Sequence, residues 1–194
     1  NYFYLSPLLT WALLVVYGIP INNQVGDNRM KLELKNIKHA NWASEETQCY
    51  DAVLYVDGDP FLMVSNEGRG GADRDDIDPR FKGDAVTMYV ALRQYCREAY
   101  KFKGFKDTWI NGSIELACHT LLEEHLETKH YKKVLKQVCF VDDKGDILSF
   151  PKRVKPSPAI YKEIREQRDD LKNVTFLNEL SFDDAVAKIK SAEV

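Results

Sequence analysis

Cysteine is scarce in this chain of 194 residues, and so is net charge. Its four cysteines lie at wide spacings without a CxxC pair, which is not the pattern of a disulfide-stapled domain or a zinc site. We therefore expect buried thiols in a reducing compartment. The formal net charge is only −3, so no basic field over the whole protein attracts nucleic acid. With 44% hydrophobic and 29% charged residues, the chain also lacks the bias of a disordered or collagen-like protein.

Charged residues are absent from residues 2–21, the one long apolar run. It lacks the basic start and the small-residue cleavage site of a signal peptide. Two prolines interrupt it, which leaves too short a stretch for a bilayer span of about 20 residues. The chain opens with Asn1, and its first methionine, Met30, begins a segment with strand-like alternation. We expect residues 1–29 to be a leader translated from upstream of the natural start, with a membrane anchor as the alternative.

Alternation and turn residues predict an antiparallel sheet built from two hairpins. Residues 31–37 alternate between polar and apolar side chains, which is typical of a half-buried strand. Residues 50–56 and 61–64 flank an Asp-Gly turn, which favours a hairpin. Residues 138–141 and 147–150 flank a second polar turn and form the other predicted hairpin.

Helical periodicity predicts four helices. They cover residues 85–100, 114–128 with a basic extension to 136, 158–168 and 182–190. A short strand is predicted at residues 174–177, and residues 65–84 form a long polar loop. The order of elements indicates an α+β fold, in which a small antiparallel sheet packs against three to four helices. We expect residues 30–194 to form a single domain.

The long loop begins with a glycine-rich segment that is a candidate binding site. Its residues are Ser65, Asn66, Glu67, Gly68, Arg69, Gly70 and Gly71. Glycine backbone can present N–H groups to an anion, and an arginine at the centre can bind phosphate with two hydrogen bonds. The segment is not a P-loop, because it lacks the Gly-Lys-Ser/Thr ending and a helix directly after it. The alternative is a loop tip whose glycines merely permit positive φ.

A run of basic residues is a second candidate, for contacts to nucleic acid. Its members are Arg93, Arg97, Lys101, Lys103 and Lys106. Arg93, Arg97 and Lys101 recur at helical spacing, and aromatic residues are interleaved with the run, as in single-strand binding proteins. The alternative is a solvated helix face with its aromatic residues in the core.

We expect neither a metal site nor a catalytic site at two further groups of titratable residues. Asp73, Asp75, Asp76 and Asp78 lie among arginines, so solvated salt bridges are the expected arrangement. Glu115, His119 and Glu123 share one helical face at a spacing that can chelate a metal, but this face is expected to point to solvent. His125 falls on the apolar stripe of the same helix and is expected in the core. No histidine has a recognisable nucleophile nearby, so no catalytic residue and no cofactor is predicted.

Several segments resemble an uncharacterised family of small proteins encoded by phages and other mobile elements. The likeness rests on MKLELKNIKHA from Met30, ASEETQC from Ala43, YVDG from Tyr55, SNEGRGG from Ser65 and VTFLNELSFDDAV from Val174. Members typically start at the position of Met30, so residues 1–29 lie outside the family. The resemblance implies a phage-encoded protein in the cytoplasm of the host cell and supplies no activity.

These observations favour a non-catalytic accessory protein that binds a host protein or nucleoprotein, and an inhibitor of host defence would fit this description. Nucleic acid is a further candidate partner through the basic run. One alternative function is a phosphate- or nucleotide-handling enzyme that uses Ser65–Gly71. The other is a membrane-anchored accessory protein, which requires residues 1–29 to be a genuine anchor.

Overall fold

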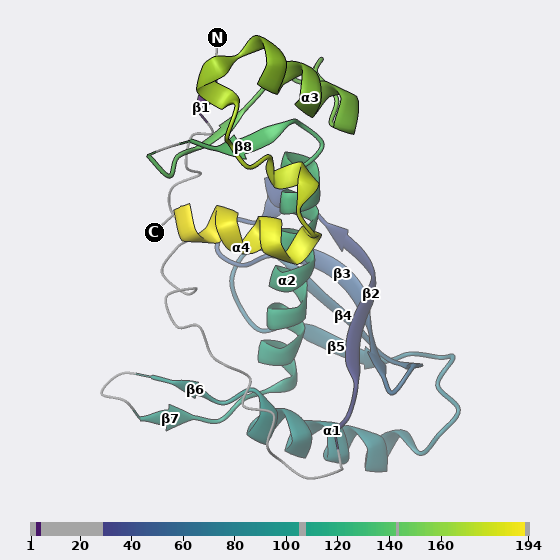
Figure 1. The fold of residues 1–194 in the computed structure, drawn as a ribbon. Helices are drawn as coiled ribbons and strands as arrows, with labels where there is room; N and C mark the ends of the chain where they lie inside the picture. The colour runs from purple at the N-terminus through teal and green to yellow at the C-terminus, as the bar shows by residue number, and fades with distance from the viewer. Residues whose placement is uncertain (1–2, 5–28, 105–107, 143, 193–194) are drawn as a thin grey trace. The chain divides into compact units, whose positions relative to one another are not determined.

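The computed structural model describes residues 3–4, 29–104, 108–142 and 144–192. Most of the expected leader, and Lys106 of the basic run, therefore lie outside the described residues. The chain divides into two compact units. The expectation of one domain from residue 30 onward stays a prediction. We call Tyr17–His125 the N-terminal unit, and Asn1–Val16 together with Leu126–Val194 the C-terminal unit. Each unit has its own antiparallel sheet, as Figure 1 shows.

The α+β class predicted from the sequence is confirmed, and the two predicted hairpins are present. They lie in separate sheets instead of one. The physical reason is that each hairpin contributes to a buried core of its own, in its own unit.

The sheet of the N-terminal unit has the order β2-β3-β4-β5, and all its strands are antiparallel. Its strands are β2 (Leu32–His39), β3 (Cys49–Val56), β4 (Asp59–Glu67) and β5 (Arg74–Ile77). Every second side chain of β3, from Tyr50 to Val56, is buried, as the period of two requires. Asp57 and Gly58 have φ of 52° and 96°, the left-handed conformations that a tight two-residue hairpin turn needs.

The prediction that residues 65–84 form one long loop is wrong in two places. Residues 65–67 continue β4, and Arg74–Ile77 form the edge strand β5. The sequence of β5 is mostly charged and has little intrinsic preference for a strand. It is held by its pairing with β4 and by Tyr89, whose hydroxyl donates to Asp75 Oδ2 at 2.7 Å.

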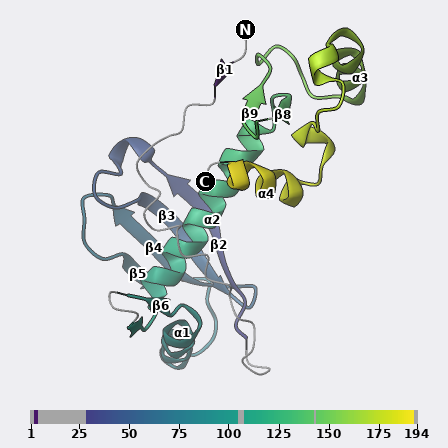
Figure 2. The ribbon, with the colours of Figure 1, turned by 60° about the vertical axis from the view of Figure 1, so that its left-hand side comes forward.

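The rest of the N-terminal unit consists of helix α1, the first half of α2, a 3₁₀ helix and a short hairpin. Helix α1 (Ala85–Ala99) begins at Asp84, whose carboxylate accepts hydrogen bonds from the backbone N–H groups of two first-turn residues. The 3₁₀ helix η1 (Asn41–Ala43) and the small hairpin of β6 (Phe102–Lys103) and β7 (Trp109–Ile110) also belong to this unit. The first half of α2 (Ile114–Val134) lies across one face of the sheet in both ribbon views (Figures 1 and 2), where its residue His119 contacts the Tyr50 ring.

The C-terminal unit contains a small sheet and two further helices. The sheet has the order β1-β9-β8, and its strands are β1 (Phe3–Tyr4), β8 (Cys139–Val141) and β9 (Ile147–Ser149). The helices are α3 (Pro158–Gln167), α4 (Phe182–Ala192) and the 3₁₀ helices η3 (Asp169–Leu171) and η4 (Leu177–Glu179). The predicted strand at residues 174–177 is reduced to a single bridge between Phe140 and Phe176.

The described cysteines are all free thiols. Cys96, Cys118 and Cys139 are buried, as expected, whereas Cys49 is half-buried. Burial raises the pKa of Cys139 to about 11 and that of Cys96 to about 12, so these thiols are unreactive at neutral pH. Over the described residues, none of the helices combines the length and the apolar character that a membrane span requires.

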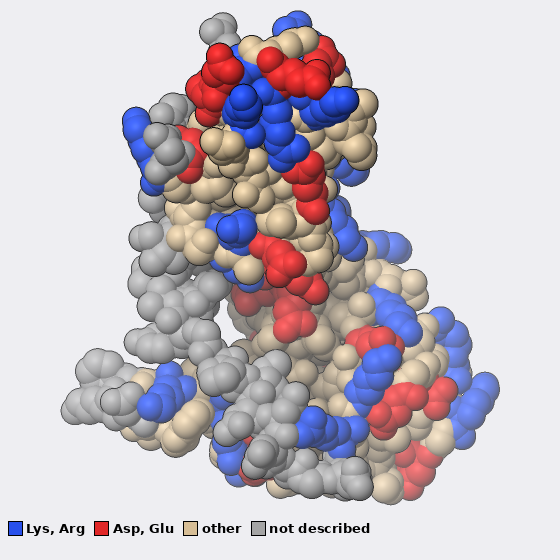
Figure 3. All heavy atoms as spheres, in the orientation of Figure 1, with Lys and Arg blue, Asp and Glu red and all other residues tan. Residues whose placement is uncertain are grey.

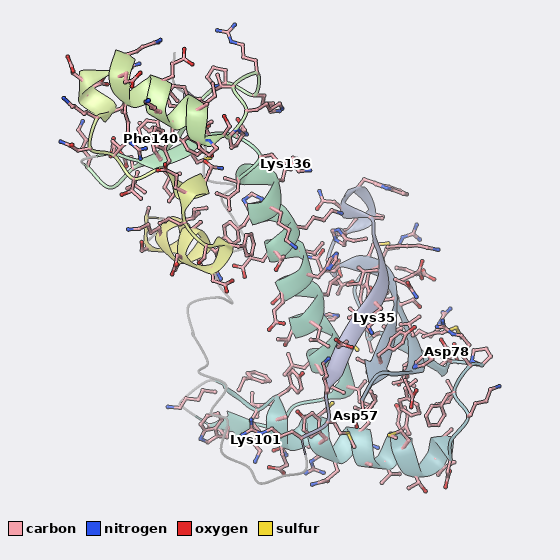
Figure 4. The ribbon with its side chains drawn as sticks, turned by 45° about the vertical axis from the view of Figure 1, so that its right-hand side comes forward. Lys35, Asp57, Asp78, Lys101, Lys136 and Phe140 are labelled. Carbon is pink, nitrogen blue, oxygen red and sulfur yellow. The ribbon has the colours of Figure 1, made fainter. Side chains whose placement is uncertain are left out.

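A buried carboxylate lies directly after the last residue of β5 (Figure 4). Asp78 is only 2% exposed, and its oxygens accept hydrogen bonds from the Arg80 backbone N–H at 2.8 Å, Nε at 2.9 Å and Nη2 at 2.6 Å. These bonds from the side chain and backbone of Arg80 lower the pKa of Asp78 to about 2. Because this pKa is lower than the value of about 3.9 in an unfolded chain, the carboxylate stabilises the fold above pH 4.

We expect Asp78→Asn to lower the urea midpoint of unfolding at pH 7. Since the stabilisation is lost as the carboxylate is protonated, the difference from wild type should shrink as the pH falls from 4 toward 2. Asp76→Asn is the matched control, because Asp76 is an exposed carboxylate two residues earlier, on β5. Urea titrations at several pH values measure both, and a difference that stays constant down to pH 2 would contradict the role given to the charge.

Candidate functional site

The N-terminal unit contains a pocket of about 560 Å³ where β5, α1 and the start of α2 meet. It is lined by Val64, Asp73, Asp75, Tyr89, Arg93, Arg97, Asn111, Gly112, Ser113, Ile114, Glu115 and Cys118. This volume lies within the range of ordinary small-molecule sites. The lining is markedly polar, with three carboxylates and two guanidinium groups, so it suits a charged ligand better than an apolar one.

Asp73 is the centre of the acidic part of the pocket, and its side chain is only 5% exposed. Its Oδ1 accepts a hydrogen bond from Asn66 Nδ2 at 2.9 Å and another from His119 Nε2 at 3.1 Å. Its Oδ2 accepts a hydrogen bond from the Tyr50 hydroxyl. Its backbone N–H donates to Glu115 Oε1 at 3.1 Å. Residues from β3, β4 and α2 thus fix the position of this one carboxylate.

These contacts and the burial of the site shift the pKa values of Asp73, His119 and Tyr50. Burial raises the pKa of Asp73, but the hydrogen bonds from His119, Tyr50 and Asn66 outweigh it and leave the pKa below its usual value. The hydrogen bond to Asp73 raises the pKa of His119 against the opposite effect of burial. Burial, and then the bond to Asp73, raise the pKa of Tyr50 far above its ordinary value. Asp73 is therefore ionised at neutral pH, and Tyr50 is a neutral donor.

Arg93 and Arg97 form the basic wall of the pocket, one turn apart on α1. Both are exposed, and within the described part of the chain neither guanidinium has an ion-pair partner. Tyr89, one turn earlier, is tied to Asp75 through its hydroxyl. The backbone carbonyl of Arg97 accepts a hydrogen bond from the Gly112 N–H at 3.3 Å, which links α1 to the segment just before α2.

The structure does not bring the whole basic run to one place. Arg93 and Arg97 line the pocket, whereas Lys101, which follows the C-terminal end of α1 (Figure 4), is paired with Glu98. Lys103 lies over the Trp109 ring, with Nζ 5.8 Å from the ring centroid. The run is thus divided between a pocket wall and surface contacts.

The glycine-rich segment uses its backbone groups within the fold. The Gly68 carbonyl accepts N–H groups from Glu45 at 2.8 Å and Glu46 at 2.9 Å. The Gly68 N–H donates to Asn66 Oδ1 at 2.8 Å, and the Gly70 N–H donates to Thr47 Oγ1 at 3.3 Å. Two of the N–H groups that were expected to hold an anion are therefore already bonded.

The other members of this segment take different positions. Ser65, Asn66 and Glu67 belong to β4, and Arg69 is exposed to solvent. Asn66 is the buried member, and its amide reaches from this segment to Asp73 in the pocket. The segment therefore supports the pocket through Asn66.

The expected solvent exposure of the acidic and histidine groups is wrong for the residues that matter most. Asp73 and Asp75 line the pocket, and Glu115 and His119 are half-buried beside Asp73. His125, expected in the core, is exposed. For the aspartates, the error came from treating residues 65–84 as a loop, whereas Asp75 lies on strand β5 and Asp73 directly before it. The charged sequence of β5 gave no hydrophobic pattern that would have indicated this strand.

Outside the pocket, charge is evenly distributed on the face drawn in Figure 3. Lysine and arginine side chains there are intermingled with aspartate and glutamate in each unit. This agrees with the small net charge of −3. The pocket, which two guanidinium groups and three carboxylates line, is the more specific electrostatic feature.

Comparisons with protein-family models, with curated protein sequences and with solved structures gave no match to this chain. The resemblance to phage proteins, the host partner and the cytoplasmic location therefore stay predictions.

Proposed function

We propose that this is a binding protein for a phosphate-bearing ligand, which the N-terminal unit takes into the pocket between β5, α1 and α2. The observation that carries the proposal is the pair Arg93 and Arg97. Their guanidinium groups line one pocket and have no carboxylate partner among the described residues. Arginine binds phosphate oxygens with two parallel hydrogen bonds, so two arginines one turn apart can hold one phosphate or two neighbouring ones.

The start of α2 supports the same ligand chemistry. Ser113, Ile114 and Glu115 from this helix start line the pocket, and α2 is 21 residues long. The N-terminus of a long helix carries a partial positive charge that favours anions. Ser113 caps the helix by accepting the Leu116 N–H at 3.0 Å, which fixes the direction of this first turn.

The size of the pocket limits the ligand. A volume of about 560 Å³ accommodates a mononucleotide or the terminal nucleotide of a single strand, but no duplex. Tyr89 adds aromatic surface to the lining, the kind of group on which bases stack. A nucleoprotein partner, as expected from the sequence, would present such a phosphate.

Reversing the charge of both arginines, in the double variant R93E/R97E, should weaken binding of a 5′-phosphorylated single-stranded oligonucleotide by more than about 100-fold. The reason is that removing each charge-assisted hydrogen bond costs about 1.5–3 kcal/mol. The slope of log affinity against log salt should fall by about 0.7 for each phosphate that the variant no longer neutralises. Fluorescence anisotropy at low salt measures both quantities.

Lys101→Glu is the matched control, because Lys101 follows the same helix but does not line the pocket. It should reduce affinity only slightly. Competition by a mononucleotide, compared with an unphosphorylated strand, distinguishes a nucleotide site from a strand-binding site. Wild-type protein that binds no phosphorylated probe at low salt would refute the proposal, and so would equal weakening by the control.

A further inference from the structure

Three carboxylates border the pocket in which a phosphate is proposed to bind. They belong to Asp73, Asp75 and Glu115. Asp75 accepts the Tyr89 hydroxyl, but Asp73 and Glu115 lie together and would repel an anionic ligand. A cation between them would remove this repulsion.

We propose that Asp73, Glu115 and His119 bind a divalent metal ion. One ligand atom from each residue lies within 4.8 Å of the other two, so the three can converge on one ion after small side-chain movements. Two carboxylate oxygens and one imidazole nitrogen form a donor set suited to Zn²⁺ and Mn²⁺. Three protein ligands leave at least one coordination position open.

The positions of these three residues in the fold support a metal site. Glu115 and His119 are four residues apart on α2, so their side chains project from the same face of the helix. The imidazole distinguishes this group from an ordinary cluster of surface carboxylates. Asp73 is nearly buried, and its charge partner in this structure is His119, whose imidazole is itself one of the three donors.

Two neutral side chains fix the direction of the Asp73 carboxylate. In metal sites, hydrogen-bonding residues around the ligands do the same. The Tyr50 hydroxyl and the Asn66 amide each donate a hydrogen bond to its carboxylate. Such outer hydrogen bonds fix the direction of a ligating carboxylate and tune its affinity for the ion. A bound ion would replace the present contact between Asp73 and His119.

The role of this metal in the pocket rests on the proposed function. Asp73 and Glu115 line the same pocket as Arg93 and Arg97, so an open position on the ion would face the space between them. One phosphate oxygen could then bind the metal while the guanidinium groups bind the others. The ligand is thus inferred to enter as a metal-bound phosphate.

The test uses the full chain, stripped of metal with EDTA, and titrates it with Zn²⁺, Mn²⁺ or Mg²⁺ alone by calorimetry. We expect one Zn²⁺ or Mn²⁺ per chain and a higher melting temperature with the ion. His119→Ala and Glu115→Gln should weaken binding by more than about 100-fold, since even a supporting residue outside the ligand set costs 10- to 100-fold. His125→Ala, an exposed histidine on the same helix, should bind as wild type does.

Glu115→Gln preserves the shape of the side chain, so it tests the site even if His119→Ala fails to fold. Absence of saturable binding, or binding unchanged in both variants, would overturn the metal site. Since no phosphate is present, that failure leaves the proposed phosphate ligand untouched. The R93E/R97E protein should still bind the metal, whereas oligonucleotide binding by wild type should drop in EDTA, and full binding in EDTA would overturn the role of the metal.

Discussion

Replacing Gly68 with alanine should destabilise the protein by about 2–5 kcal/mol, because two costs apply at once. Gly68 has φ of +82°, a conformation that costs a residue with a Cβ about 1–2 kcal/mol. A Cβ there would also overlap the carbonyl oxygen of Ala43 and lie 2.8 Å from Cβ of Cys49. The neighbouring backbone cannot easily retreat, since Glu45 and Glu46 donate hydrogen bonds to the Gly68 carbonyl.

Gly71→Ala separates the two costs. Gly71 has φ of +97°, but nothing lies within 4 Å of the position that its Cβ would take. Only the conformational cost of about 1–2 kcal/mol should therefore appear. Urea denaturation of both variants measures the free energies of unfolding, and equal losses would show that the segment around Ala43 moves aside freely.

The elements that could be predicted from the sequence are those whose signal is local. The Asp57-Gly58 turn has the positive φ values that this dipeptide favours, and β3 buries every second residue. At the start of α4, the Ser181 hydroxyl donates to Asp184 Oδ2 at 2.7 Å and accepts the Asp184 N–H at 3.2 Å. The Ser181 hydroxyl thus caps the helix, and serine followed three residues later by an acidic residue is a local signal of a helix start.

The candidate site could not be predicted in the same way, because its contacts join distant parts of the chain. Asp73 and His119 are separated by 46 residues, and Asp73 and Glu115 by 42. The strand that positions Asp75 carries mostly charged residues, so its pairing with β4 leaves no hydrophobic pattern. The sequence indicated helix α2 and the spacing of Glu115 and His119, but it did not indicate that Asp73 lies beside them.

The glycine-rich segment also shows that a local sequence pattern does not reveal contacts with distant residues. Its composition correctly indicated positive φ, which Gly68, Gly70 and Gly71 all adopt. Whether its N–H groups face a ligand or the protein depends on Thr47 and Asn66, which accept them. Thr47 lies 23 residues before Gly70, and no local pattern reveals such a partner.

The division into two units has a comparable origin. The hairpin signals at Asp57-Gly58 and around Gly145 were correct for each hairpin by itself. Which strands lie beside a hairpin is determined by the apolar faces that it buries, and both hairpins offer such faces. The C-terminal hairpin buries its own cluster around Phe140, and this cluster leads to the second large effect that we expect.

Replacing Phe140 with alanine should cost about 3–5 kcal/mol of unfolding free energy, as other large-to-small changes of a buried phenylalanine do. Phe140 is 1% exposed and lies on β8 beneath α3 (Figure 4). Its ring centroid is 5.7 Å from that of Phe150 and 6.1 Å from that of Phe176. The variant would therefore remove the ring that packs against both of these aromatic side chains and leave a cavity that the sheet cannot readily close.

Phe140→Leu is the graded control, since it keeps most of the apolar volume and should cost less than about 1.5 kcal/mol. Hydrogen exchange followed by mass spectrometry locates the effect. Protection should fall in residues 139–149 and 158–177, because Tyr161 and Phe176 stack in the same cluster, with their ring centroids 5.1 Å apart. An alanine variant as well protected as the leucine variant would mean that these aromatic rings add little to the packing of the C-terminal unit.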